Sequence, residues 1–243
     1  MKVISLNTWS GVLLEPLLKF FESHNDVGIF CLQEIYSNAA GKEEKHPVHD
    51  FKLDIFQQIQ HTLRETHVGY FRPAHQDYYG LAMFVRKEIQ VEEEGGMFVY
   101  ENNAPRRRGE RSRNIQYISM TVEGISTMVI HIHGQWSTEG KADSEARLLQ
   151  SKKVVDFLLK NNIRKILIGD FNLEPNTQSL NMIETHMRNL ITENTITSTR
   201  THHYKETGTF SDYAFVSPEI KVLDFKVLPD EVSDHSPLYL EFE

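Results

Sequence analysis

Short apolar runs alternate with amphipathic segments along the whole chain. The runs are predicted to be buried strands at Met1–Leu6, Val27–Leu32, Leu81–Val85, Met97–Tyr100, Ile115–Val122, Thr127–Ile132, Ile166–Ile168, Tyr213–Val216, Val222–Val227 and Leu238–Phe242. Apolar positions at helical spacing predict helices at Glu15–Ser23, Phe51–Glu65, Asp143–Leu159 and Thr177–Met187. This mixture, with hairpin-like strands in the middle, indicates an α/β or α+β fold with more than one sheet.

Five apolar residues are predicted to form one side of the third of these helices, Asp143–Leu159. They are Ala146, Leu149, Val154, Phe157 and Leu158. We therefore expect this side of the helix to pack against a sheet.

The composition is that of an ordinary globular protein. Of 243 residues, 40% are hydrophobic and 25% charged, which is most simply explained by a single domain over residues 1–243, with two domains as the alternative. Cys31 is the only cysteine, and the first residues lack the apolar core of a signal peptide, so a reducing, cytoplasmic location is expected. No apolar run has the length of a membrane span, so no stable membrane insertion is expected. The net charge of -8 argues against broad binding of polyanions but leaves room for a local basic patch or a bound metal.

In six segments, polar residues of the kinds used in catalysis or metal binding lie at or near the end or the start of a predicted strand. These residues are Asn7, Glu34, His131 with His133, Asp170 with Asn172, Asp212, and Asp234 with His235. Open α/β sheets collect ligands at strand ends, so the six segments are predicted to converge on one cleft.

Each of these residues also has a purely structural explanation. Asn7 is a common residue in a turn that ends a strand, "GDFN" fits a turn closed by an aspartate side chain, and a single histidine is usually structural. The functional hypothesis is favoured because the same arrangement recurs six times.

The residue types suit metal-assisted hydrolysis of a phosphoester. Oxygen ligands from Glu34, Asn7 and Asp234 suit Mg²⁺ or Mn²⁺, whereas a single cysteine makes a thiolate zinc site implausible. His235 is a candidate acid–base group or transition-state donor, and Asp212 is the candidate to orient it. Asp170 would position or deprotonate a water. Asn172 and His131 would then donate hydrogen bonds to the developing oxyanion charge.

The ordered motifs "LNTW", "LQE", "HIHG", "GDFN", "SDYAFVS" and "SDHSP" closely resemble those of the endonuclease/exonuclease/phosphatase superfamily, which includes DNase I-like nucleases and phosphatases. The resemblance runs from Asn7 to His235. It implies a four-layer α/β/β/α sandwich of two packed mixed sheets flanked by helices, with the site at one rim.

The resemblance also implies roles for individual residues. Glu34 matches the main metal-binding glutamate, with Asn7 beside it, and Asp234 matches the second carboxylate near the metal. Asp170 matches the aspartate that orients or activates water, Asn172 the asparagine on the phosphate, and Asp212 the partner of the terminal histidine, His235. His131 falls where relatives place a histidine or tyrosine facing the phosphate, with His133 as the alternative. Several relatives carry an acidic residue where this chain has Trp9, so one principal Mg²⁺ is expected and Trp9 is expected to pack or line the cleft rim.

The substrate is less well defined by the sequence. The segment Ala104–Asn114 contains five arginines and is either a solvated loop or an arm that grips phosphate, with Arg113 as the best candidate to reach the cleft. Trp136 could stack on a base or sugar or be buried in packing. A phosphodiesterase or nuclease acting on nucleic acid or a nucleotide-like substrate is favoured. The alternatives are a phosphatase or phospholipase acting on inositol phosphates or sphingomyelin, and an inactive binding module. We expect a monomer.

Overall fold

Two six-stranded mixed sheets pack face to face in the computed structural model, which describes residues 1–43, 46–105 and 108–243. The first sheet has the order β11-β12-β1-β2-β4-β3. Its strands are β1 (Lys2–Asn7), β2 (Ile29–Tyr36), β3 (His67–His75), β4 (Tyr79–Arg86), β11 (Val222–Val227) and β12 (Leu238–Phe242). The second sheet has the order β5-β6-β7-β8-β10-β9. Its strands are β5 (Val91–Tyr100), β6 (Arg113–Val122), β7 (Ile125–His133), β8 (Arg164–Asp170), β9 (Arg188–Asn189) and β10 (Asp212–Val216).

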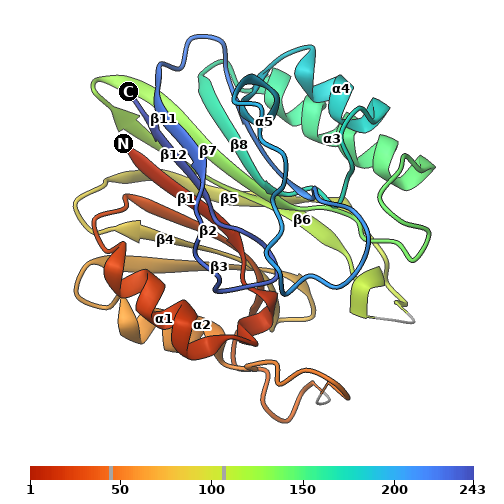
Figure 1. Ribbon diagram of the computed structural model, residues 1–243. Coiled ribbons are helices and arrows are strands. Elements are labelled where there is room, and N and C mark those ends of the chain that lie inside the picture. Colours follow the sequence, from red (N-terminus) through yellow and green to blue (C-terminus); the bar gives the residue numbers. More distant parts are fainter. Residues whose placement is uncertain (44–45, 106–107) are drawn as a thin grey trace.

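Helices cover the two outer faces of this sandwich. Helices α1 (Leu14–Ser23) and α2 (Ile55–Thr62) lie on one side and α3 (Glu145–Lys160) and α4 (Gln178–Glu184) on the other, with the strands between them (Figure 1). The short α5 (Leu190–Glu193) follows β9, and single 3₁₀ turns occur at Trp9–Gly11 and Arg108–Glu110. The predicted four-layer sandwich is therefore confirmed.

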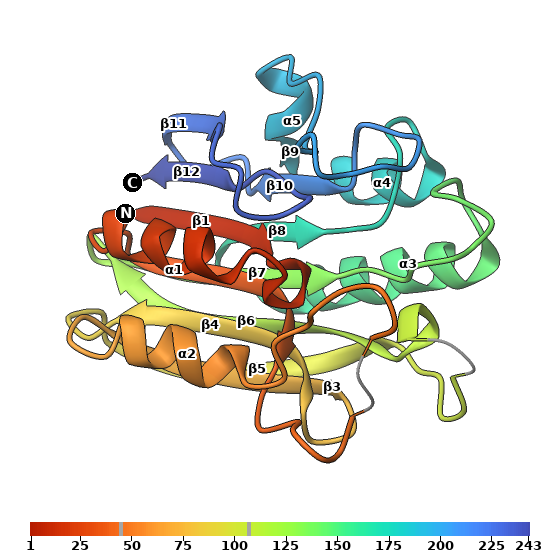
Figure 2. The same ribbon diagram turned by 60° about the horizontal axis from the view of Figure 1, so that its bottom comes forward.

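Two apolar clusters correspond to these layers. One joins the inner face of the first sheet to both faces of the second sheet and to α3 and α4; the other lies between the first sheet and α1 and α2. In the rotated view, α1 and α2 lie in front of the strands of the first sheet (Figure 2). None of the helices in the described ranges is long and apolar enough to cross a membrane.

The predicted elements all occur, with ends that differ by a few residues, but β3, β9 and α5 were not predicted. Strand β3 carries Gly69 and Pro73 and lies at a sheet edge, where the apolar pattern is weak. The predicted apolar side of α3 is partly wrong, because Leu149 is 53% exposed whereas Arg147 and Gln150 are buried.

The strand directions bring the six polar segments to one edge. Strands β1 and β2 run parallel, as do β7 and β8, so their carboxyl ends point the same way. Strand β10 is antiparallel to β8, and β12 is antiparallel to β1, so the residues at their starts reach that same edge. In the register, Asp170 of β8 stands beside both His133 and Asp212.

Candidate active site

A cavity of about 310 Å³ opens at the edge where these strand ends meet. Its walls include Glu34 from the first sheet, Asp170 from the second, and Asp234 and His235 from the segment before β12. Asn172, His133 and Trp9 also line it, whereas Asp212 lies behind His235. Segments that are more than 200 residues apart in sequence therefore form one wall.

Asp170 is a buried carboxylate held by several donors. Its Oδ1 accepts hydrogen bonds from Ser211 Oγ at 2.7 Å and from the backbone N–H of Asn172 at 2.9 Å. Its Oδ2 accepts from Asn7 Nδ2 at 2.9 Å. Burial by itself would raise the pKa of Asp170, but the nearby His235, His133 and Arg200 outweigh burial, so the pKa lies below its ordinary value. Asp170 is therefore anionic at neutral pH.

His235 is oriented from behind by Asp212. Its Nδ1 lies 2.9 and 3.0 Å from the two Asp212 oxygens, and Thr199 Oγ donates to Asp212 Oδ2 at 3.0 Å. The opposite nitrogen, Nε2, lies 3.7 Å from Asp170 Oδ2 and 3.9 Å from Asp234 Oδ1, so it faces the cavity. Burial and Arg200 act to lower the pKa of His235, but the carboxylates of Asp212, Asp234 and Asp170 raise it above its ordinary value. This arrangement favours an imidazolium that points Nε2–H at the cavity.

Glu34 reaches the cavity because β2 is irregular at this point. The pairing of β2 with β4 shifts between Leu32 and Ile35, and Glu34 adopts a positive φ of 60°. The extra residue turns the Glu34 side chain out of the sheet toward the cavity. Its Oε1 accepts from Asn7 Nδ2 at 3.2 Å and its Oε2 from Ser10 Oγ at 3.3 Å.

The environment of Glu34 suits a bound cation. Burial and the neighbouring Asp234 carboxylate raise the pKa of Glu34, so the anion is poorly stabilised by the protein alone. Carboxylate oxygens are the ligands that Mg²⁺ and Mn²⁺ prefer, so the donor set of Glu34 and Asp234 fits such an ion. Asp170, Asp212 and His235 also bring ligand atoms within 4.8 Å of one another, although His235 Nδ1 is already bonded to Asp212.

The geometry changes the predicted role of Asn7. Its Nδ2 donates to both Glu34 and Asp170, and its Oδ1 accepts from the Trp9 backbone N–H at 3.0 Å. The amide therefore turns its nitrogen, rather than the oxygen that a metal would need, toward the carboxylates. In this arrangement Asn7 positions the two acids.

The prediction that His131 faces the phosphate is wrong, because His131 does not line the cavity, whereas the alternative residue His133 does. Alternate residues of β7 point to the same side, but His131 lies about 7 Å deeper between the sheets than His133. His131 is fully buried and bonds to Gln33 Nε2 at 3.2 Å and to Gln116 Oε1 at 2.9 Å. His133 lines the cavity with its Nε2 3.7 Å from Asp170 Oδ2, and burial lowers its pKa well below the ordinary value.

Arg113 and Trp136 both line the cavity, but Arg113 is largely engaged with backbone. Its guanidinium donates to the carbonyls of Gly134 and Gly109, each at 2.9 Å, and it is only 2% exposed. The Trp136 indole packs directly on Gly109, where a side-chain carbon would come within 2.2 Å of the ring. These contacts fix the wall of the cavity. Arg106 and Arg107 of the predicted phosphate-gripping arm lie outside the described residues.

The structure adds cavity residues that the sequence did not reveal. Arg200 is one of them: its Nη1 lies 3.4 Å from Asp234 Oδ2, its guanidinium stacks 4.0 Å above the Tyr204 ring, and its buried Nε has no hydrogen-bond partner among the described residues. Lys141 also lines the cavity. Arg200 pairs with His235 in an isolated bridge, and "TRTHHY" shows no strand pattern, so only the charge of Arg200 could have indicated it.

A family model described as the endonuclease/exonuclease/phosphatase family matches residues 4–235. The chain belongs to this family. No curated protein sequence matches the chain. Members of the endonuclease/exonuclease/phosphatase family are generally hydrolytic phosphoesterases, which agrees with the convergence of Asp170 and His235 on one cavity.

Solved structures share the fold of this family member at low sequence identity. A mannosyl-6-phosphatase from Bacteroides thetaiotaomicron is 18% identical with a TM-score of 0.74, and the match covers 100% of this chain and 99% of that one. A humanized TDP2 from D. rerio is 14% identical with a TM-score of 0.75, covering 100% and 98%. The human Nocturnin catalytic domain, solved with a bound sulfate, is 16% identical with a TM-score of 0.70, covering 100% and 93%. The TM-scores show a common fold, and at these low identities they do not show a common substrate.

Proposed function

We propose that this protein is a metal-dependent hydrolase of phosphoester bonds. The observation that supports it most is the single cavity in which the Asp170 carboxylate, the His235 imidazole and the Glu34 carboxylate meet. A phosphate bound there would be surrounded by three groups: a carboxylate that accepts a hydrogen bond from the attacking water, a cationic imidazole that donates a hydrogen bond, and a carboxylate that can bind a metal ion.

Asp170 and His235 would divide the chemistry between them. A carboxylate with a lowered pKa is a weak base, so Asp170 would mainly hold the attacking water in line by accepting its hydrogen bond. His235, kept protonated by Asp212, would donate Nε2–H to an oxygen of the phosphate as negative charge builds there. Asn172 and His133, on the same wall, would contact the remaining phosphate oxygens.

Glu34 and Asp234 would hold one Mg²⁺, with Mn²⁺ as a substitute. When bound, the ion would neutralise charge on a phosphate oxygen. Asn7 and Ser10 would keep the Glu34 carboxylate in place through their hydrogen bonds to its two oxygens.

The cavity favours a nucleotide-like phosphodiester. Aromatic rings of Trp9, Tyr204 and Trp136 line it beside the cations Arg200 and Lys141, which suits a phosphate attached to a flat ring or sugar. Long duplex DNA is disfavoured as a substrate. The cavity has a volume of about 310 Å³, and a net charge of -8 is unlike the extended basic face that proteins use to hold many phosphates. A phosphomonoester of a small molecule is the second candidate, because a cavity of this size would also accept it.

Loss of metal and loss of either central group are expected to abolish turnover. EDTA should stop hydrolysis, and Mg²⁺ or Mn²⁺ should restore it. Asp170→Asn and His235→Asn should each lower kcat by roughly a hundredfold or more while thermal unfolding stays close to that of the unmodified protein. Asp156→Asn, at an exposed ion pair with Lys152, is the matched control and should retain full turnover.

The assay uses Mg²⁺ with a panel of nucleotides, single-stranded and duplex DNA, RNA, sugar phosphates, inositol phosphates and sphingomyelin. Full activity in chelator would remove the metal from the proposal. Normal turnover by both variants would remove the roles of Asp170 and His235. Preference for monoesters over diesters would replace the first candidate substrate by the second.

A further inference from the structure

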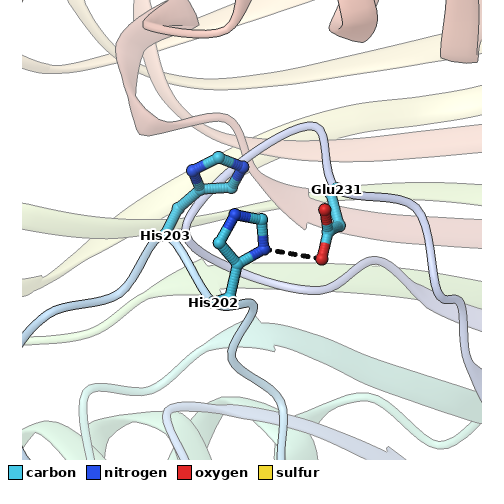
Figure 3. A group of neighbouring side chains, drawn as sticks. All are labelled: His202, His203 and Glu231. Carbon is cyan, nitrogen blue, oxygen red and sulfur yellow. Dashed lines mark hydrogen bonds and ion pairs between the residues drawn. The ribbon is translucent and has the colours of Figure 1, made fainter.

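A second group of potential metal ligands lies outside the cavity. His202, His203 and Glu231 each offer one ligand atom, and these atoms lie within 4.8 Å of one another (Figure 3). His202 Nδ1 lies 2.6 Å from Glu231 Oε1, and the two imidazole centroids are 3.9 Å apart. His202 and Glu231 are exposed and His203 is half-buried, so dissolved ions can reach them.

The backbone under these three side chains is held in place by other groups. The Thr201 backbone N–H donates to the Asp234 carbonyl at 3.2 Å, and Thr201 Oγ donates to the Ser233 carbonyl at 2.6 Å. The turn that carries the histidines is therefore fastened to the segment that carries Glu231. An ion would need only side-chain adjustment, because the two backbone segments are already in register.

The donor set points to an ion of a different kind from the one proposed in the cavity. Two imidazoles and one carboxylate are a common zinc ligand set and leave one coordination position for water. Zinc lies about 2.0–2.2 Å from such atoms, so it would separate His202 Nδ1 and Glu231 Oε1 to roughly 3.3 Å and replace their hydrogen bond. We propose that His202, His203 and Glu231 form a binding site for a Zn²⁺-type cation, separate from the catalytic cavity.

The position of this site indicates what a bound ion would do. It would tie together the turn that carries Arg200 and Tyr204 and the segment that continues to Asp234 and His235, all of which line the cavity. The His203 ring also lies 6.5 Å from that of Trp9 on the cavity wall. The ion would therefore stabilise one side of the cavity without touching the phosphate.

Zinc binding to the full chain can be measured by calorimetry in excess Mg²⁺, which limits binding in the cavity. The unmodified protein is compared with Glu231→Gln and with the double variant His202→Gln/His203→Gln. The control is His186→Gln, which removes an exposed histidine elsewhere. We expect Zn²⁺ affinity to fall by roughly tenfold or more in both cluster variants and to be unchanged in the control. Zn²⁺ should raise Tm only in the proteins with an intact cluster.

Co²⁺ provides an independent readout of the ligands. Bound to the intact cluster, it should show the visible absorption of a four- or five-coordinate ion, and this absorption should be lost in the double variant. Equal Zn²⁺ affinity in all four proteins would overturn the proposal. Loss of affinity in His186→Gln as well would also overturn it, because binding would then depend on histidines in general. Equal Tm of the metal-free proteins checks that the substitutions leave the fold intact.

Discussion

Asp170 and Glu34 are carboxylates of the same cavity, yet their pKa values move in opposite directions. Burial acts on both, but for Asp170 the cations His235 and Arg200 and the Ser211 hydroxyl outweigh it. For Glu34, burial and the Asp234 carboxylate act together and raise the pKa. The protein's own cations thus stabilise the Asp170 carboxylate, whereas the Glu34 carboxylate needs a bound ion to stabilise its charge. This difference supports the proposal that Asp170 accepts a hydrogen bond from the attacking water while the neighbouring Glu34 binds a metal ion.

Arg200 is the residue that we expect to contribute most to substrate binding among those that the sequence did not reveal. Its charge lies against Asp234, and its Nε is buried without a described partner, so a phosphate oxygen could bond to it. Replacing Arg200 by Met keeps much of the aliphatic stem but removes the guanidinium that stacks on Tyr204. We expect kcat/KM to fall by roughly tenfold to a hundredfold, with a rise in KM. Arg200→Lys should recover part of the loss, because it restores the charge without the fork.

Steady-state kinetics with the substrate found in the panel measure this effect. Arg188→Met removes a half-buried arginine that is paired with Glu193 and does not line the cavity, and it should leave both constants unchanged. The pH profile gives a second readout: Arg200 acts to lower the pKa of His235, so its loss should move the limb assigned to His235 to higher pH. An unchanged KM together with an unmoved profile would contradict a role for Arg200 at the phosphate.

At the scale of single elements, strand β2 departs from regular pairing where it contributes Glu34 to the cavity. Glu34 sits in a bulge with a positive φ, and Trp9, Ser10 and Asn172 on the cavity wall also have φ between 49° and 54°. Non-glycine residues in this region cost about 1 kcal/mol or more each and persist where surrounding contacts hold them. Asn7 and Ser10 supply such contacts to Glu34.

Glu34→Gln should therefore increase stability while removing activity. In chelator at pH 8, we expect the free energy of unfolding to rise by about 1 kcal/mol, because an unfavourable buried charge is removed. The raised pKa of Glu34 fixes the sign: the gain is largest above the folded pKa and is lost as pH falls below the ordinary value of 4.5, where Glu34 of the unmodified protein is protonated in both the folded and the unfolded state. Turnover should fall by roughly a hundredfold or more. Urea unfolding and Mg²⁺-dependent hydrolysis measure the two effects.

Glu101→Gln, at an exposed glutamate, serves as the matched control and should change neither quantity. Added Mg²⁺ should narrow the stability difference, since only the unmodified protein gains from binding the ion. Lower stability of Glu34→Gln at pH 8 in chelator would show that the carboxylate is well satisfied without metal, against our interpretation.

The elements also show where sequence patterns succeed and fail. The positions of Asp170 and His235 near strand ends were predictable, because each lies within three residues of an apolar run. Helix α3 was harder, because Arg147 and Gln150 are buried to hold a loop: Arg147 donates to the carbonyls of Ala142, Gly140 and Gln135. Leu149, which the apolar pattern assigned to the core, faces solvent instead. Burial of polar groups to fix the loop that precedes the helix leaves no periodic signal, and neither does the bridge that brings Arg200 to His235.

At the scale of the whole molecule, a chain of polar side chains crosses the interface between the two sheets. Gln33 of β2 donates to His131 of β7 at 3.2 Å, and His131 Nε2 lies 2.9 Å from Gln116 Oε1 of β6. Gln116 Nε2 then donates to the Tyr70 carbonyl of β3, back in the first sheet, at 3.0 Å. His131 must accept on Nδ1 and donate from Nε2, so it is neutral. The residue that the motif suggested for catalysis therefore joins the two sheets.

This role gives the stability of the protein a defined dependence on pH. Burial lowers the pKa of His131 to about 3, whereas the unfolded chain titrates near the usual 6.5. Because the folded pKa is the lower one, the unfolded state takes up the proton first, so this contribution to stability is complete above pH 6.5 and is lost as pH falls toward 3. The loss between pH 8 and pH 5 should be about 2 kcal/mol.

Urea unfolding of the unmodified protein and of His131→Gln, in chelator at both pH values, isolates the contribution of His131. The variant should be less stable than the unmodified protein at pH 8, and this difference in the free energy of unfolding should shrink by about 2 kcal/mol at pH 5. His186→Gln should keep the slope of the unmodified protein. Parallel slopes for the unmodified protein and His131→Gln would mean that His131 is protonated within the folded interface, and the neutral chain of hydrogen bonds between the sheets would be wrong.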